Sequence, residues 1–409
     1  MGSDKIVSMP SSKPSNIYSF LSALRDLLLI APFISPPFAK ILADKVDFVF
    51  LVHPMDLKDF AKQFPFMRFI PQRYLKMVSR HLWPIIGPAI DGYITPNGAV
   101  KGRVIFCPLT TKMMLLKKDA ARAKILTAVK LGEKLGAKMI GLGAFIPIVT
   151  EDGLFLKDKT KVTVTTGTAY AAVISMQNVL QIAEILGINN GKTCLAIVGA
   201  GGSVGSLCAI ALADKFDKVI LVDKNYDAAI AVRDSIKKIN NRFGQLIVTA
   251  QVDTVIDADI VLAVTNVPGA VIKSRHLKSG AVVVDAGFPK NVSKKVIRER
   301  NDVLVIESGI AQIPGVKTVF DFQMGIKSID EVFSCLAEAL LLLWLGQTGK
   351  YVGKIDYSYF QQLFNGAESG KIKLAKFRND DGYITNDKIN DFRKMLNKIN
   401  SEMPKQKYV

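Results

Sequence analysis

The segment at residues 195–205 is the feature that most constrains what this chain can fold into. An apolar, β-branched run ends at Gly199, and a helical pattern opens at Ser203 after a turn rich in glycine. A strand, a tight turn and a helix in this order bring backbone N–H groups and a helix N-terminus together, which suits a pyrophosphate. The sequence therefore predicts a dinucleotide-binding turn made by Gly199, Gly201, Gly202, Ser203, Val204 and Gly205.

A second apolar run at residues 218–222 leads to Asp223, which lies 24 residues after Gly199. This is close to the spacing of an acid that hydrogen-bonds the adenosine ribose. The carboxylate favours the ribose diol of NAD and repels the 2′-phosphate of NADP, whereas the neighbouring Lys224 can hold that phosphate. The predicted cofactor is therefore NADH or NADPH, and the local chemistry does not choose between them.

Strand signals continue along the chain and alternate with helical stretches. They lie at residues 246–250, 259–264, 281–284 and 303–306, which is typical of a parallel, doubly wound sheet. Upstream, a buried strand at 47–53, a hairpin over 91–107 and a basic helical stretch at 110–138 predict another α/β unit. A chain of 409 residues is also too long for one core.

We therefore expect an α/β protein with a doubly wound Rossmann sheet, a separate N-terminal α/β substrate domain and a C-terminal helical part. The predicted boundaries are 1–46 for an N-terminal extension with an amphipathic helix, 47–165 for the substrate domain, 166–315 for the dinucleotide-binding domain and 316–409 for the helical segment with its basic tail.

Composition limits the class of protein and its partners. Hydrophobic residues make up 49% of the chain and charged residues 22%, which is typical of a globular protein. The net charge of +18 suits an acidic partner: nucleic acid, an anionic membrane surface or an acidic carrier protein. The four cysteines are far apart and form no CxxC pair, so we expect reduced thiols, no metal site and a cytoplasmic location.

Residues 17–33 are the strongest candidate for a membrane element. Arg25 and Asp26 interrupt the apolar run and Pro32 ends it, so it is too short to span a bilayer. Two expectations remain: a helix packed on the protein, or a helix lying on a membrane surface.

The carboxyl ends of the predicted strands supply candidate chemistry, because ligands of doubly wound sheets bind there. Thr265 and Asn266 follow one strand, and a loop containing Gly287 follows another. Gly287 would let backbone approach a nicotinamide ring, although ordinary turn chemistry explains these residues as well.

A strong helix is predicted over residues 328–345. Ser328 and Glu331 have the spacing of a capping box, which would place Cys335 two turns inside the helix, too deep for full help from its dipole. Glu338 lies on the same face, and a carboxylate in an otherwise apolar helix is costly unless it is paired or near water. From pattern alone Cys335 is a small buried hydrophobe.

Several short motifs in order change that interpretation. They are residues 48–53, Asn97-Gly98 through Gly102-Arg103, 142–145, 165–167, 285–291 and 335–339. From about residue 47 to 345 the chain resembles the cyanobacterial-type long-chain fatty-aldehyde-forming acyl-(acyl carrier protein) reductase family.

The resemblance implies that Cys335 is the nucleophile and that it forms an acyl-enzyme with a fatty acyl thioester. Glu338, on the same face of the predicted helix, is the second expected catalytic residue. It implies that NADPH then yields a fatty aldehyde, although this chain has Val222-Asp223-Lys224 where the family carries Thr-Ala-Arg. By the same resemblance and by charge, the expected substrate and carrier contacts are His53, Phe145, Thr165, Thr166, Lys117, Lys118 and Arg122. An acidic acyl carrier protein or coenzyme A, and no nucleic acid, is the expected partner.

Two other readings remain open. One is an NAD(P)-dependent dehydrogenase of a small acid or amino acid with no covalent step. The other is a non-catalytic NAD(P)-binding protein at a membrane surface.

Overall fold

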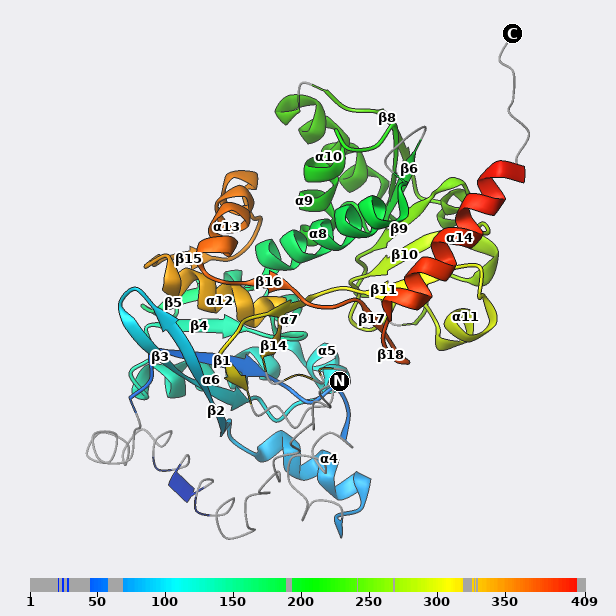
Figure 1. The fold of residues 1–409 in the computed structure, drawn as a ribbon. Helices are drawn as coiled ribbons and strands as arrows, with labels where there is room; N and C mark the ends of the chain where they lie inside the picture. Colours follow the sequence, from blue (N-terminus) through cyan, green and yellow to red (C-terminus); the bar gives the residue numbers. More distant parts are fainter. Residues whose placement is uncertain are drawn as a thin grey trace, which may run out of the picture.

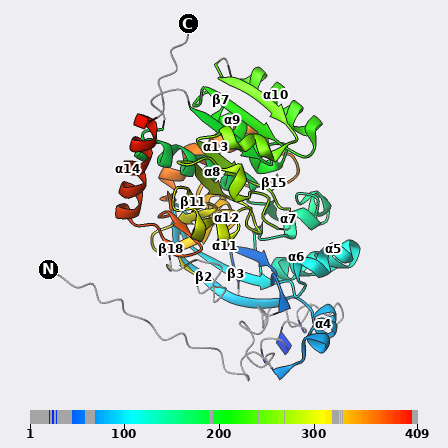
Figure 2. The same ribbon diagram turned by 90° about the vertical axis from the view of Figure 1, so that its right-hand side faces the viewer.

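The computed structural model describes residues 45–57, 69–188, 193–240, 242–267, 269–318 and 330–402, with single positions at Leu21, Leu24, Arg25, Leu28, Ile326 and Ser328. The expected membrane-surface helix at 17–33 lies outside these residues apart from four of those positions. In the views of Figures 1 and 2 two separate sheets are visible, with helices α8 (Thr168–Leu186) and α12 (Ser334–Trp344) between them.

The dinucleotide sheet has six strands in the order β11-β10-β9-β6-β7-β8, and each pairs in parallel with its neighbours. Their bounds are β6 Cys194–Val198, β7 Lys218–Val222, β8 Gln245–Thr249, β9 Ile260–Ala263, β10 Val282–Asp285 and β11 Leu304–Glu307. The strand order reverses beside β6, so the carboxyl ends of β6 and β9 border the crevice where such sheets bind ligands. The predicted doubly wound α/β fold is confirmed.

The first sheet contains seven strands in the order β13-β2-β3-β1-β4-β5-β15. The predicted hairpin is present as β2 (Ile85–Thr95) and β3 (Gly98–Phe106), and β1 (Phe48–Val52) lies parallel to β3 and to β4 (Met139–Leu142). Strand β5 spans Thr163–Thr165. Burial on both faces explains the continuous apolar run of β1, because helices and loops cover each side of the sheet.

Helices connect and cover these strands. Their bounds are α4 Gln72–His81, α5 Thr111–Leu116, α6 Lys118–Lys134, α7 Ile146–Val149, α9 Ser203–Leu212, α10 Tyr226–Ile239 and α11 Lys294–Glu299, with 3-10 turns at Leu154–Leu156, Val252–Asp257 and Ser274–His276. Among the described residues, α8 is the one helix long and apolar enough to cross a membrane by length and composition. Two thirds of that stretch is buried inside the fold, against α9, α12 and α13 (Tyr357–Ser369).

The segment 316–409 is more than the helical piece with a basic tail that the sequence predicts. Strands β13 (Lys317–Thr318) and β15 (Lys350–Tyr351) form the two edges of the first sheet. A smaller sheet joins β12 (Ile310–Gln312), β14 (Glu331–Phe333) and β16 (Lys373–Leu374), and a hairpin of β17 (Arg378–Asn379) and β18 (Gly382–Tyr383) precedes α14 (Asn386–Glu402). The first sheet is therefore not made from residues 47–165 alone.

Apolar residues at helical spacing explain why α13 and α14 form and pack against the rest of the protein. Phe360, Leu363 and Ala367 on α13 and Ile389, Phe392 and Leu396 on α14 are buried, while the intervening positions are mostly exposed and charged or polar. In Figure 1, α13 lies above α12 beside one end of α8, and α14 lies beside the dinucleotide sheet.

Candidate functional site

The glycine turn after β6 has the geometry that the sequence predicts. Gly199 has φ +93°, and a methyl group on Gly205 would come 2.1 Å from the carbonyl oxygen of Gly199. Glycine is thus needed both for the left-handed turn and for the close packing of α9 on β6. Gly202 is the N-cap of α9 and gives no side-chain hydrogen bond to its first turn, which starts with Ser203, Val204 and Gly205.

Asp223 lies beside this turn at the end of β7. Its Oδ2 accepts the N–H of Gly201 at 2.9 Å and its Oδ1 accepts the N–H of Asn225 at 2.9 Å. A methyl group on Gly201 would lie 3.1 Å from the same carboxylate. The acid is therefore fixed next to the glycine turn, and the side chain of Lys224 is exposed beside it.

The loop after β10 closes the crevice from the other side. Asp285 is buried and accepts the N–H groups of Gly287 at 3.0 Å and Asn291 at 2.8 Å. Thr265, after β9, donates its hydroxyl to the Asn291 side chain, and Asn266 next to it is exposed. Burial raises the pKa of Asp285, while Lys290 and these hydrogen bonds oppose that rise.

Close packing explains why position 287 is a glycine, and the sequence analysis missed this reason. A methyl group there would come 1.6 Å from Nδ2 of Asn291 and 2.9 Å from the carbonyl oxygen of Thr265. The absence of a side chain lets Asn291 tie the two loops together, whatever ligand lies above them. Asp285 and Asn291 belong among the residues that shape this crevice, and their signal is the Asx pattern of the loop.

The helix that carries Cys335 begins at Ser334, so the predicted start at Ser328 is wrong. Residues Glu331–Phe333 form β14, which pairs with β12, and Ser328 donates to Asp330. Glu331 forms a buried ion pair with Arg378 and accepts the hydroxyl of Tyr383 at 3.0 Å. The side chains of the expected capping box thus take other partners: Ser328 binds Asp330 and Glu331 binds Arg378, while the Glu331 N–H donates to the carbonyl oxygen of Ser328 at 3.4 Å.

Cys335 is consequently the second residue of its helix and lies in the first turn, where N–H groups are free and the dipole is felt. The expectation that it lies too deep for this help is wrong. Burial raises the pKa of its thiol to about 12, and the nearby Glu338 contributes to this rise. The backbone N–H groups of Leu336, Cys335 and Ala144 lower the thiol pKa and so oppose that rise. Ala144, with φ +52°, follows β4 by two residues. The backbone N–H groups of three residues therefore favour the thiolate, against the effect of burial.

Two helix N-termini meet at this cysteine. Gly167 is the N-cap of α8 in a left-handed conformation, φ +74°, and a methyl group on it would come 2.2 Å from Cβ of Cys335. The positively polarised N-termini of α8 and α12 therefore lie side by side at this residue.

Glu338 is fully buried one turn further along α12. Its Oε2 accepts the N–H of Tyr170 at 2.7 Å. Its Oε1 accepts the hydroxyl of Tyr359 at 3.1 Å and also the hydroxyl of Thr165. Burial raises the pKa of Glu338, and these three donors oppose the rise. The carboxylate caps α8, whose own N-cap has no side chain.

The predicted substrate residues near the thiol are engaged with the protein. His53 is buried, its Nδ1 donates to the carbonyl oxygen of Pro54 at 2.9 Å, and its Nε2 accepts the N–H of Phe145 at 2.9 Å. The histidine thereby holds the loop that presents Ala144. Thr165 binds Glu338, and the hydroxyl of Thr166 hydrogen-bonds that of Thr168 at 2.9 Å. Contact with substrate stays a prediction for all of them.

The predicted carrier-binding cations divide into two groups. Lys117 and Lys118 are exposed at the junction of α5 and α6. Arg122 donates to the carbonyl oxygen of Val149 at 2.9 Å and pairs with Glu151 at 2.5 Å, so it fastens the loop after α7.

Tyr359 is a site residue that the sequence analysis missed. It reaches Glu338 from α13, and its ring stacks on that of Tyr351 at 4.5 Å between centroids. Its only signal in the sequence is its place in an amphipathic helix, within the segment predicted to be a basic tail.

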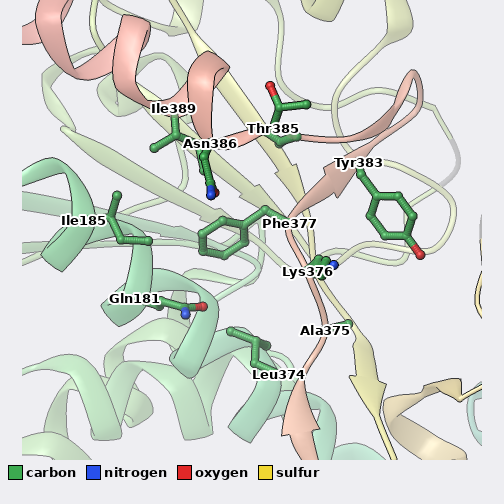
Figure 3. Close-up of a pocket in the computed structure, with 11 residues that line it drawn as sticks. Gln181, Ile185, Leu374, Ala375, Lys376, Phe377, Tyr383, Thr385, Asn386 and Ile389 are labelled. Atoms are coloured by element: carbon green, nitrogen blue, oxygen red, sulfur yellow. The ribbon is translucent and has the colours of Figure 1, made fainter. Parts of the chain in front are cut away.

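A cavity of about 490 Å³ lies elsewhere, between α8, β16 and the start of α14 (Figure 3). Phe377, Ile185 and Ile389 line its apolar side and Gln181 and Asn386 its polar side. Gln181 is thirteen residues along α8 from Thr168, which is about 20 Å at the rise of an α-helix. The cavity is therefore separate from the thiol.

Comparison with known proteins finds sequence relatives of this chain. No protein-family model matches the chain. It is 28% identical over 286 residues to the long-chain acyl-[acyl-carrier-protein] reductase of Synechococcus elongatus, covering 64% of this chain and 80% of that protein. It is 23% identical over 304 residues to the aminotransferase PigE of a Serratia species, covering 72% of this chain and 35% of that protein.

Solved structures align at low similarity. Quinate dehydrogenase from Corynebacterium glutamicum with NAD matches 78% of this chain and 99% of its own, at 16% identity and a TM-score of 0.36. The nucleotide-binding domain of glutamyl-tRNA reductase from Thermoplasma volcanium matches 32% of this chain and 84% of its own, at 20% identity and a TM-score of 0.25.

Proposed function

We propose that this protein is an NAD(P)H-dependent reductase that converts a long-chain acyl thioester to a fatty aldehyde through an acyl-enzyme on Cys335. The observation that carries the proposal is the place of Cys335 in the first turn of α12, against Gly167 and within reach of the Ala144 N–H. The similarity to a long-chain acyl-[acyl-carrier-protein] reductase, over 64% of this chain, supports it.

The glycine turn fits a dinucleotide. The first turn of α9 has no side-chain cap, and the glycines at 199, 201 and 205 let the backbone come close to a pyrophosphate. Asp223 would accept hydrogen bonds from the adenosine ribose, and the exposed Lys224 beside it could meet a 2′-phosphate. When bound, the nicotinamide supplies the hydride for the reduction.

The residues of this chain would then act as follows. The thiol of Cys335 adds to the thioester carbonyl, the carrier or coenzyme A sulphur leaves with the proton, and the acyl group stays on Cys335. After reduction, the thiohemiacetal oxyanion collapses, breaks the bond between carbon and Cys335 Sγ, and releases the aldehyde. The thiolate that remains takes up a proton from water.

The raised pKa of Cys335 has a consequence for the first step. The thiol keeps its proton in the free protein, so proton loss must accompany attack on the carbonyl. The N–H groups of Cys335, Leu336 and Ala144 favour the thiolate, and they are fixed by α12 and by His53 through Phe145. Because two thioesters are similar in energy, the exchange needs mainly this positioning.

The acidic carrier or the phosphates of coenzyme A would be met by the exposed Lys117 and Lys118, whereas Arg122 is already paired. A cytoplasmic location, with peripheral contact at a membrane through residues 1–46, belongs to the same proposal.

Mass spectrometry of the intact protein after mixing with palmitoyl-coenzyme A, without dinucleotide, tests the covalent step. We expect a palmitoyl increment on the wild type and none on Cys335→Ala, and we expect NADH or NADPH to remove it as the aldehyde forms. No increment on either protein, with carrier-linked substrate also tried, would overturn the covalent route. It would favour a dehydrogenase without a covalent step.

A further inference from the structure

A carboxylate from the loop after α7 contacts the start of α9, at the end of the glycine turn. The hydroxyl of Ser203, the first residue of α9, donates to Oδ2 of Asp152 at 3.0 Å. Asp152 is partly exposed and follows α7 by three residues. The contact therefore joins the two halves of the candidate site across the crevice.

The loop that presents Asp152 is held in an unusual conformation. Glu151, Asp152 and Gly153 have φ values of +55°, +51° and +80°, in the left-handed region that disfavours the first two. Arg122 fastens the loop through Val149 and Glu151, and the backbone carbonyl of Asp152 accepts the N–H of Gly353 at 2.7 Å. Contacts on both sides thus keep the Asp152 carboxylate aimed at α9.

That place is the one a dinucleotide pyrophosphate needs. A helix N-terminus attracts one anion and a serine hydroxyl has a single proton to donate, so a carboxylate and a phosphate compete for both. We propose that Asp152 is a gate at the cofactor site: its carboxylate holds Ser203 in the free protein and must yield it when a dinucleotide binds. This inference rests on the proposed function, because it assumes that the glycine turn binds NAD(P)H.

The proposal predicts that removal of this negative charge strengthens dinucleotide binding. Asp152→Asn keeps the size of the side chain, and asparagine tolerates the left-handed backbone. Asp152→Gly also removes the unfavourable left-handed conformation of a residue with a side chain, and it serves as the second variant if the asparagine amide disturbs the loop. Asp158→Asn is the matched control, since it removes an exposed carboxylate six residues further along the chain.

The experiment is a fluorescence titration of full-length protein with NADH and with NADPH. At low salt we expect both Asp152 variants to bind with a Kd roughly three- to tenfold lower than the wild type, and Asp158→Asn to match the wild type. The advantage should shrink as salt rises to about 0.15 M, where the Debye length falls to about 8 Å. An unchanged or higher Kd in both Asp152 variants would overturn the gate. Failure of every protein, wild type included, to bind either dinucleotide would instead overturn the proposed function.

Discussion

The backbone of Gly167 lies directly against Cys335: a Cβ atom built on the glycine would come within 2.2 Å of Cys335 Cβ and 2.3 Å of Cys335 Cα. The glycine precedes α8 and the cysteine is the second residue of α12, so the two helix starts touch at Cys335. No flexible side chain separates them that could move aside.

Gly167→Ala should therefore disable the site. The added methyl must displace the start of α12, and φ of +74° is itself unfavourable for alanine. We expect a loss of about 2–4 kcal/mol in the free energy of unfolding and at least a hundredfold fall in reductase activity. Gly187→Ala is the control, because that glycine has a similar φ and open space around it at the other end of α8. Denaturant unfolding and a kcat assay measure the stability and the activity of both variants. Equal stability of the two variants would contradict the close contact between Gly167 and Cys335.

Tyr359→Phe tests whether the C-terminal segment belongs to the site. The change removes one of the three donors to the buried Glu338 and keeps the ring that stacks on Tyr351. We expect a loss of about 1–2 kcal/mol in stability and a fall in kcat larger than any change in KM. Tyr357→Phe, on the same helix, should change neither. A wild-type kcat in Tyr359→Phe would show that Glu338 is positioned adequately without it.

The thiol pKa predicts the pH dependence of alkylation at Cys335. Because burial raises this pKa from the ordinary value to about 12, the thiolate is scarce at neutral pH and grows as pH rises. The rate of reaction with iodoacetamide should increase about tenfold per pH unit between pH 7 and 10, without a plateau. Peptide mass spectrometry separates Cys335 from the three buried cysteines, and Cys335→Ala gives the background. A plateau below pH 9 would show that the surrounding N–H groups outweigh burial.

Asp223→Ser should shift the preference between the two dinucleotides toward NADPH. The Asp223 carboxylate repels the 2′-phosphate of NADPH and accepts hydrogen bonds from the ribose diol of NADH. Its removal should therefore strengthen NADPH binding and weaken NADH binding. We expect the ratio of kcat/KM for NADPH to that for NADH to rise about tenfold or more. Asp214→Ser, at the far end of α9, removes an equal charge and should leave the ratio unchanged. An unaltered ratio in Asp223→Ser would place the ribose elsewhere.

Local patterns in the sequence determined the glycine turn, the hairpin of β2 and β3 and the parallel sheet built on β6. Each depends on residues that are neighbours in the chain: a β-branched run, a glycine that must take a positive φ, an amphipathic period. The placement of Asp223 beside Gly201 follows from the same βαβ unit, which fixes where its strands end.

The thiol site depended on partners far away in the chain. Glu338 binds Tyr170 and Thr165, which precede it by 168 and 173 residues, and the start of α12 is set by the pairing of β14 with β12. The local sequence favours a capping box at Ser328. A buried charged group needs a partner, however, and in the folded protein Glu331 pairs with Arg378. The sequence by itself therefore determined the glycine turn where we propose that a dinucleotide binds. Only the tertiary structure decided that Cys335 lies in the first turn of its helix, because burial and long-range pairing outweigh a local cap.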